Sequence, residues 1–371
     1  EMARAETKDE KYLVVDHLIK WFGSDRAVDD VSFSIEKGKF LTLLGPSGCG
    51  KTTTLMSIAG LHTIDSGEIR VGDIIYTSRE KKIFLAPEKR DIGMVFQSYA
   101  IWPHMTVAQN VAYPLEIRKI ERVEIDERVD KVLALVGLTE MSDKLATQLS
   151  GGQQQRASLA RAIVSNPLLL LFDEPLSNLD LKLREQMRVE LKRIQNEVGI
   201  TSIYVTHDQS EALVMSDEII VMSKGQIEQR DIPLSVYSKP ANGYVSQFIG
   251  VANLIEGTLL KKNKSGTGVA DLNKTIKGLT CDCVLSSELE SGDDVLVSIR
   301  PENISVSKKN TGGKGIKGKV DLAIFLGNCV DCRISSDGFE WKVLSHPREN
   351  LQQGDSVFLH LDPKHTLAVT P

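Results

Sequence analysis

Long hydrophobic runs are missing from this sequence. The longest, Leu168–Phe172, is far shorter than the roughly 20 apolar residues that cross a bilayer as a helix. Its flanking Pro167 and acidic residues favour a short buried strand instead. The opening residues 1–11 are mostly polar, so we expect a disordered tail there and no secretory signal.

The sequence also has few cysteines and no excess of positive charge. Five cysteines in 371 residues fit a reducing compartment better than a disulfide-linked scaffold. Lys and Arg total 45 against 50 Asp and Glu, which gives a formal net charge of −5 at pH 7. Because general nucleic-acid affinity normally needs a basic surface, we expect no nucleic-acid partner.

Strand-like and helix-like patterns alternate over the first two thirds of the chain, which indicates an α/β domain. A helix is expected over Lys51–Ala59, and an amphipathic one over Glu121–Val136 inside a mainly helical stretch. The expected strands of this part are Phe40–Leu44, Asp91–Phe96, Leu168–Phe172 and Thr201–Val205.

The pattern changes near Pro240, where short alternating segments broken by Gly, Asn, Ser and Lys predict small antiparallel β units. We expect a loop over Lys308–Lys319, which is rich in Gly and Lys. The expected strands are Val295–Ile299, Gly318–Leu322, Val330–Ile334 and Val357–Leu361.

The segment Gly45–Thr52 has the spacing G-x-x-x-x-G-K-[ST] of a phosphate-binding loop, between an apolar strand and a helix. Its glycines let backbone N–H groups surround a phosphate. Lys51 can then reach the outer phosphates, and the Thr52 hydroxyl can ligate Mg²⁺. The strand and helix on either side argue against a chance glycine-rich turn.

Polar residues that could take part in the chemistry follow three other expected strands. Asp173 and Glu174 are an acidic pair that can hold Mg²⁺ and polarise a water, although acids also favour helix starts as caps. His207 can contact a terminal phosphate, or be an ordinary surface residue. Gln97 can order a water or a magnesium ligand.

The segment Leu149–Gln153, Leu-Ser-Gly-Gly-Gln, opens a helix just ahead of the acidic pair. Such a helix start offers unpaired N–H groups, a serine hydroxyl and a positive dipole end, which together suit an anion. The chain therefore has two separate phosphate-binding surfaces.

In their order along the chain, these motifs resemble the ATP-binding subunit of an ABC (ATP-binding cassette) transporter, in the importer branch with an extra C-terminal domain. Residues 177–180, which include Asp180, match the family's D-loop, and Ser298–Glu302 resembles part of its C-terminal domain. The resemblance implies an α/β P-loop NTPase cassette over 12–239 with a helical insert at about 97–164. An all-β OB-like regulatory domain is implied over 240–371.

The resemblance also implies the contacts of ATP and Mg²⁺. Phe22 aligns best with the family's adenine-stacking aromatic, with Trp21 as the alternative and a core role possible for either. Glu174 matches the general base, and His207 the residue that holds the γ-phosphate. Thr52, Gln97 and Asp173 match the metal-binding positions. The remaining nucleotide contacts are expected at Gly45, Ser47, Gly48, Cys49, Gly50, Lys51, Thr53, Ser150, Gly151, Gly152, Gln153 and Asp180.

The family's partners follow from the same resemblance. Two copies would bind head to tail, each ATP lying between the phosphate loop of one and the Leu149–Gln153 segment of the other. Permease subunits would bind the helical insert at the cytoplasmic face of the membrane, and an extracytoplasmic protein would capture the solute. Ordinary packing is the alternative role for the candidate groove residues, which are Tyr99, Trp102, Met105 and Tyr113.

In the segments 100–107 and 248–254 the chain resembles importers of Fe³⁺, a polyamine or a phosphonate-like ion, and the resemblance leaves a sugar importer as the alternative. A soluble ABC ATPase of translation or DNA repair is disfavoured by the single cassette and acidic balance. Glu174 and His207 argue against a nucleotide binder that does not hydrolyse. Two closely spaced cysteine pairs could bind a metal ion, namely Cys281 with Cys283 and Cys329 with Cys332. Their spacing on the expected strands disfavours a metal site.

Overall fold

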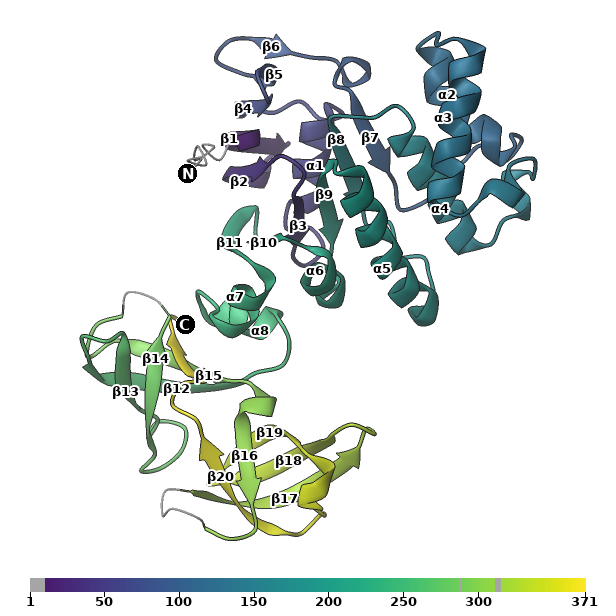
Figure 1. The fold of residues 1–371 in the computed structure, drawn as a ribbon. Coiled ribbons are helices and arrows are strands. Elements are labelled where there is room, and N and C mark those ends of the chain that lie inside the picture. Colours follow the sequence, from purple (N-terminus) through teal and green to yellow (C-terminus); the bar gives the residue numbers. More distant parts are fainter. Residues whose placement is uncertain (1–10, 287–288, 311–314) are drawn as a thin grey trace, which may run out of the picture. The chain divides into compact units, whose positions relative to one another are not determined.

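A computed structural model describes residues 11–286, 289–310 and 315–371, so nearly all of the expected tail lies outside the described residues. The chain divides into two compact units, Glu1–Pro233 and Leu234–Pro371. This division falls slightly before the boundary of 239/240 expected from composition. Figure 1 shows helices and strands together in the first unit, and mainly strands in the second.

The first unit is built around a six-stranded sheet in the order β11-β10-β3-β9-β8-β7. Its strands are parallel except for β11, which pairs antiparallel with β10. Every residue of β3 and β9 is buried, as expected for central strands that are covered on both faces. The strands are β3 (Phe40–Leu44), β7 (Ile92–Val95), β8 (Leu169–Asp173), β9 (Thr201–Thr206), β10 (Glu218–Ser223) and β11 (Gln226–Asp231).

Helices connect these strands. The helix that follows the phosphate loop is α1 (Lys51–Ala59), with the bounds expected from the sequence. Between β8 and β9 lies α5 (Leu181–Val198), and α6 (Gln209–Met215) follows β9. Since β3, β7, β8 and β9 are parallel neighbours, their carboxyl ends meet at one edge of the sheet.

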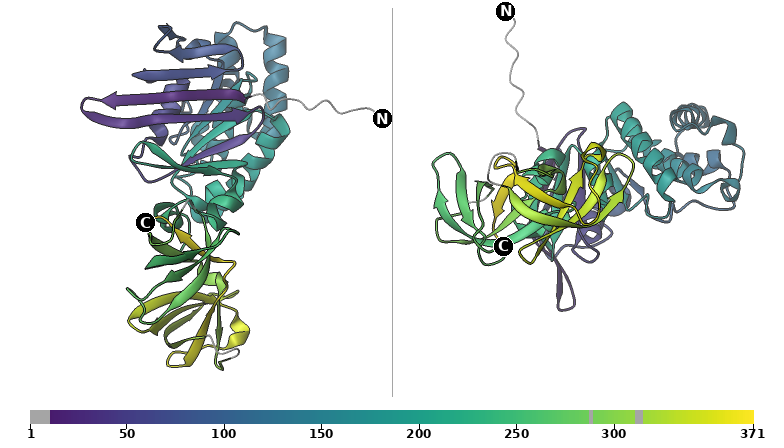
Figure 2. Two further views of the ribbon diagram at one scale, coloured as in Figure 1. Left: turned by 90° about the vertical axis from the view of Figure 1, so that its left-hand side faces the viewer. Right: turned by 90° about the horizontal axis from the view of Figure 1, so that it is seen from below.

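The sequence did not predict a second, antiparallel sheet, in the order β2-β1-β4-β5-β6. Register shifts interrupt the pairing of β1 with β2, and His17 and Asp30 have positive φ angles of 47° and 57°. These irregularities blur the two-residue alternation that identifies a strand. Figure 2 shows β1 and β2 as a long pair. The strands are β1 (Lys11–Phe22), β2 (Asp25–Glu36), β4 (Ser66–Val71), β5 (Ile74–Ser78) and β6 (Ile83–Phe84).

The expected helical insert is confirmed. It contains α2 (Val107–Ile117), α3 (Arg122–Leu135) and α4 (Gly151–Ile163). The apolar side of α3 is buried in a core that includes residues of all three helices. Short 3₁₀ helices lie elsewhere in both units as well as in the insert, at Pro87–Lys89, Thr139–Met141, Ala146–Gln148, Pro301–Asn303 and Pro347–Glu349.

The second unit starts with the short helices α7 (Pro233–Ser238) and α8 (Gly243–Phe248). A closed five-stranded barrel follows in the order β12-β13-β14-β21-β15, which confirms the OB-like expectation. The last strand, β21, follows the strands of the second sheet in the sequence and returns to the barrel between β14 and β15. The barrel strands are β12 (Asn253–Lys262), β13 (Thr267–Asp271), β14 (Thr280–Leu285), β15 (Asp294–Ile299) and β21 (Thr366–Val369).

The second sheet of this unit has the order β16-β20-β17-β18-β19. Its strand β17 begins at Ile316, so the loop expected over Lys308–Lys319 is wrong from that residue onward, while residues 311–314 lie outside the described part. The Gly318 Cα packs closely against its neighbours, which accounts for a glycine within a strand. The strands are β16 (Ile304–Ser307), β17 (Ile316–Phe325), β18 (Val330–Ser336), β19 (Phe339–Ser345) and β20 (Ser356–Leu361).

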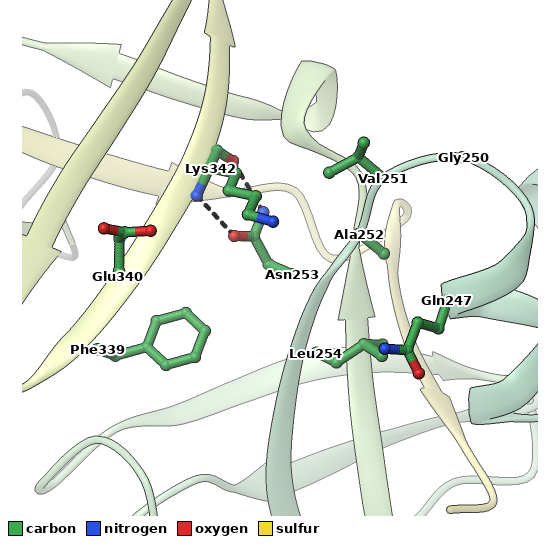
Figure 3. A pocket seen from close by; sticks show the side chains of 9 residues that line it. All are labelled: Gln247, Gly250, Val251, Ala252, Asn253, Leu254, Phe339, Glu340 and Lys342. Atoms are coloured by element: carbon green, nitrogen blue, oxygen red, sulfur yellow. Dashed lines mark hydrogen bonds between the residues drawn. The ribbon is translucent and has the colours of Figure 1, made fainter. Parts of the chain in front are cut away.

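One side chain links the barrel to this sheet. The Asn253 amide donates to the carbonyl oxygens of Lys342 (2.8 Å) and Ile299 (3.2 Å), and its oxygen accepts from the Lys342 N–H (2.8 Å). Figure 3 shows the two hydrogen bonds between Asn253 and Lys342, beside a pocket between β19 and the segment after α8. The barrel and the sheet also share one apolar core.

Candidate functional site

The phosphate loop connects β3 to α1, and two of its glycines are required by their surroundings. A Cβ on Gly45 would lie 2.4 Å from the Met222 carbonyl oxygen. Gly50 caps α1 with φ at 100°, and a Cβ there would lie 2.5 Å from the Ala27 carbonyl oxygen. The loop therefore keeps its backbone tightly curled against neighbouring strands.

Lys51 lies inside this curl and is only 4% exposed. Its Nζ donates to the carbonyl oxygens of Gly45 and Pro46, both at 2.8 Å. The ammonium is thus positioned beside the first turn of α1, whose N–H groups carry partial positive charge. Within the loop, Cys49 is buried, whereas Ser47 and Gly48 are exposed. Thr53 lies in the first turn of α1.

The acidic pair lies at the end of β8. The exposed Thr52 hydroxyl donates to Asp173 Oδ1 at 2.9 Å, so the two expected magnesium ligands are in contact. Burial raises the pKa of Asp173, the neighbouring Glu174 carboxylate raises it further, and the bond from Thr52 lowers it. These oxygen atoms have the chemistry that Mg²⁺ prefers.

Glu174 and His207 are brought together from adjacent strands. Glu174 Oε2 lies 3.0 Å from His207 Nδ1, and the Glu174 N–H donates to the Val205 carbonyl oxygen at 3.0 Å. The Glu174 φ angle is 44°, in the left-handed region that few non-glycine residues adopt. Such local strain is typical of functional positions.

Gln97 follows β7 and is exposed at the same edge of the sheet. Its carbonyl oxygen accepts a hydrogen bond from Asn178 Nδ2 at 3.0 Å. Asp180 caps α5, and its Oδ1 accepts from the Leu183 N–H at 3.1 Å. Residues 97 and 177–180 therefore adjoin the acidic pair.

The Leu149–Gln153 segment forms the start of α4. Exposed Ser150 is the N-cap residue, and Gln153 Oε1 accepts from the Ser150 N–H at 2.9 Å. A Cβ on Gly152 would lie 3.0 Å from Leu183, so α4 and α5 pack closely here. Among the described residues, no hydrogen bond joins this segment to the phosphate loop. The phosphate loop follows β3 in the middle of the six-stranded sheet, whereas α4 packs with α2 and α3 in the helical insert, so the two surfaces lie on different parts of the unit.

The two candidate adenine-stacking residues are similarly exposed, Phe22 at 46% and Trp21 at 43%. Phe22 lies edge-on to His62 with ring centroids 5.4 Å apart, and Lys20 Nζ lies 5.2 Å from its ring. Arg26 lies over the Trp21 ring at 5.5 Å. Neither ring belongs to a core, so both stay available to a base.

A pocket of about 310 Å³ lies between β7 and the helical insert. Of the four candidate groove residues, Trp102 lines it; Tyr113 packs on Trp102 at 4.4 Å between ring centroids. Tyr99 instead packs against the insert's core, and Met105 does not line the pocket. Arg161 was not expected: it lies 4.7 Å from the Trp102 ring centroid and donates to the Tyr99 carbonyl oxygen. A single arginine within a helix has no spacing signal that could have revealed this role.

Three of the four paired cysteines, Cys281, Cys283 and Cys332, belong to the apolar core of the second unit, whereas Cys329 is only partly buried. Burial raises the pKa of Cys281 to about 12 and that of Cys283 to about 11, so both stay neutral thiols at pH 7. Cys332 is also buried. Within the described ranges, no three His, Cys, Asp or Glu side chains form a group suited to a metal ion.

Comparison with known proteins agrees with this geometry. The ABC transporter family matches residues 28–177, and the TOBE domain family matches residues 297–369. The trehalose/maltose import ATP-binding protein MalK of Thermococcus litoralis is 49% identical over 287 residues, 77% of this chain and 76% of that protein. The spermidine/putrescine import ATP-binding protein PotA of Clostridium acetobutylicum is 41% identical over 347 residues, 94% of this chain and 93% of that protein.

A solved structure is also similar. The cbiO1 protein of Clostridium perfringens, part of the ABC transporter complex cbiONQ, superposes with a TM-score of 0.55 at 29% identity. The match covers 61% of this chain and 90% of that one.

The chain belongs to the ABC transporter family, as an ATP-binding protein. More particularly, it is the ATPase subunit of an importer, with a C-terminal TOBE domain. Along residues 11–286, 289–310 and 315–371, no helix is both long and apolar enough to cross a membrane.

Proposed function

We propose that ATP binds at the edge where β3, β7, β8 and β9 end, and that Glu174 activates the attacking water as general base. The contact of Glu174 with His207 carries this proposal, because it joins a base to a residue that can orient it beside a phosphate loop. Lys51 would stabilise the charge that develops on the transferred phosphoryl group.

Thr52, Gln97 and Asp173 are the residues that would hold Mg²⁺. The hydrogen bond between Thr52 and Asp173 supports this assignment, since both oxygen atoms already converge on one point. When bound, Mg²⁺ neutralises charge on the phosphates. The other nucleotide contacts are the loop residues 45–53, with Phe22 stacking on the adenine.

The complete ATPase is a head-to-tail dimer. The separation of the Leu149–Gln153 segment from the phosphate loop supports this, because Ser150 and the N–H groups at the start of α4 can complete only the site of another copy. Asp180 lies near the same segment. ATP would hold two copies closed, and hydrolysis would release them.

The partners are permease subunits, with the subunit lying peripherally at the cytoplasmic face of the membrane. The pocket lined by Trp102 and Arg161 supports a docking site on the helical insert, since aromatic and arginine side chains dominate protein interfaces. An extracytoplasmic protein delivers the solute. The second unit, residues 234–371, has a regulatory role and contributes to dimer contacts.

The transported solute is a small cation, and a polyamine is the first candidate. The PotA similarity supports this, because it extends over 94% of the chain, against 77% for the MalK similarity. The higher identity to MalK, 49%, keeps a sugar as the second candidate. The test is calorimetry on the solute-binding partner with spermidine and maltose. Tight spermidine binding supports the proposal; maltose binding without spermidine binding overturns the solute and leaves the motor residues in place.

A further inference from the structure

Arg90 is fully buried just before β7, and its guanidinium binds three separate segments of the chain. Nη1 donates to the carbonyl oxygens of Ser57 (3.0 Å) and Ile58 (2.7 Å) in the last turn of α1. Nη2 donates to Thr77 Oγ1 on β5 (2.7 Å), and Nε to the Leu85 carbonyl oxygen (2.8 Å). Every nitrogen of the side chain is thus engaged, and the planar fork joins α1 to the antiparallel sheet.

The positive charge of Arg90 is surrounded by backbone carbonyl groups and aromatic rings. Among the described residues, no carboxylate forms an ion pair with it. Its charge instead meets the negative end of α1 and the ring faces of Tyr76 (5.4 Å) and Phe84 (5.3 Å). Burial lowers the pKa of Arg90 to about 10, which leaves the guanidinium charged at pH 7.

Gly60 makes room for this arrangement. It is the C-cap of α1 with φ at 81°, and its N–H donates to the Ser57 carbonyl oxygen at 3.1 Å. A Cβ on Gly60 would lie 2.5 Å from Arg90 Nε and 2.6 Å from Cζ. The end of α1 and the guanidinium are therefore in direct contact, with no space for a side chain between them.

Two rigid elements diverge from this point. α1 extends about 13 Å from its C-cap back to Lys51 and Thr52. The short strand β7 leads from Arg90 to Gln97. Each element thus ends at a nucleotide contact, and Arg90 connects the ends that face away from the nucleotide.

We propose that Arg90 is a positioning residue that sets the separation between Lys51 and Gln97 by fastening the end of α1 to the start of β7. The inference rests on the proposed roles of those two residues. A small displacement at Arg90 moves the phosphate loop relative to Gln97, which costs rate more than it costs nucleotide affinity.

The test displaces the guanidinium while leaving Arg90 in the chain. Gly60→Ala puts a methyl group against Arg90, and Gly199→Ala is the matched control. Gly199 is the C-cap of α5 with φ at 68°, and a Cβ there meets no atom within 4 Å. Both variants therefore carry a similar backbone strain, but only the first presses on Arg90.

Turnover is measured on the full-length chain per ATP bound, below the melting temperature of both variants. We expect Gly60→Ala to lower kcat about tenfold or more while ATP affinity stays within about threefold of wild type. Gly199→Ala should keep both values within about twofold. The inference is wrong if Gly60→Ala and Gly199→Ala have the same kcat per bound ATP. It is also wrong if Gly60→Ala loses ATP affinity and kcat to the same extent.

Arg90→Lys serves if Gly60→Ala does not fold, since it keeps the charge and loses the fork; it should show the same division between kcat and affinity. If Arg90→Lys turns over at the wild-type rate, the inference is wrong. The variant Glu174→Gln distinguishes a wrong role for Arg90 from a wrong assignment of the ATPase site. If Glu174→Gln retains turnover, the ATPase site lies elsewhere and the proposed function itself is wrong.

Discussion

Glu174 Oε2 lies 3.0 Å from His207 Nδ1, and the two side chains come from the ends of adjacent parallel strands. The parallel sheet itself creates this contact, because β8 and β9 end at the same edge. No feature near either residue in the sequence joins them, since 33 positions separate them.

Glu174→Gln should bind ATP with nearly wild-type affinity and turn over at least about a hundredfold more slowly, because the amide keeps the shape and loses the base. Steady-state release of phosphate measures the rate, and a nucleotide titration measures the affinity. The variant should also accumulate as an ATP-bound dimer in size-exclusion chromatography. Turnover within threefold of wild type would remove Glu174 from the chemistry.

Asp173→Asn should stabilise the chain while abolishing Mg²⁺-dependent turnover. Burial raises the pKa of Asp173, so at pH 7 its charged form costs folding free energy. The amide removes that cost and still accepts the Thr52 hydrogen bond, and we expect the melting temperature to rise by about 2–4 °C.

The gain from Asp173→Asn has a defined pH dependence. A carboxyl whose pKa is raised on folding binds its proton more tightly in the folded state, so it destabilises the fold above that pKa. The difference in melting temperature should therefore be full at pH 7 and shrink as the pH falls through the raised pKa. A constant difference from pH 7 to pH 4 would show that burial of the charge is not the cause.

Phe22→Ala should weaken ATP binding more than Trp21→Ala does. The two residues are matched in exposure, at 46% and 43%, so the pair is its own control. Stacking of a base on an aromatic ring is worth about 1–3 kcal/mol, which predicts roughly a tenfold loss for Phe22→Ala. If the titration gives the reverse order, Trp21 is the stacking residue.

Ser150→Arg should stop turnover without changing the affinity of a single chain for ATP. Ser150 begins α4 in the helical insert, whereas the phosphate loop of the same chain follows β3 in the central sheet, so the bulky cation should block only the site of the second copy. Nucleotide titration at protein concentrations below dimer formation separates the two effects. A large loss of affinity in the monomer would place Ser150 in its own chain's site.

The sequence predicted the nucleotide-binding core well, because strong local signals coincide there. The apolar strand Phe40–Leu44 and the helix Lys51–Ala59 have the expected bounds on either side of the phosphate loop. The antiparallel sheet was missed because bulges disturb the alternation of β1. Arg90 could not be found, because its partners lie in segments far apart in the sequence and share no spacing with it.

The preference for Phe22 over Trp21 comes from the family resemblance and not from the physical properties of the two positions. Adjacent residues on a strand point to opposite faces, yet both rings remain about half exposed at the end of β1. The transported solute could not be predicted from the residues of this chain for a different reason: in the proposed assembly, the permease and solute-binding partners would contact it.

The single amide of Asn253 has a consequence for how the second unit unfolds. Because it hydrogen-bonds the β12–β15 pair to β19, and both sheets bury side chains in one core, neither sheet can open alone without leaving polar groups unpaired. The barrel and the sheet should therefore melt as one cooperative block, and amide protons of β12, β15 and β19 should exchange with the same opening free energy.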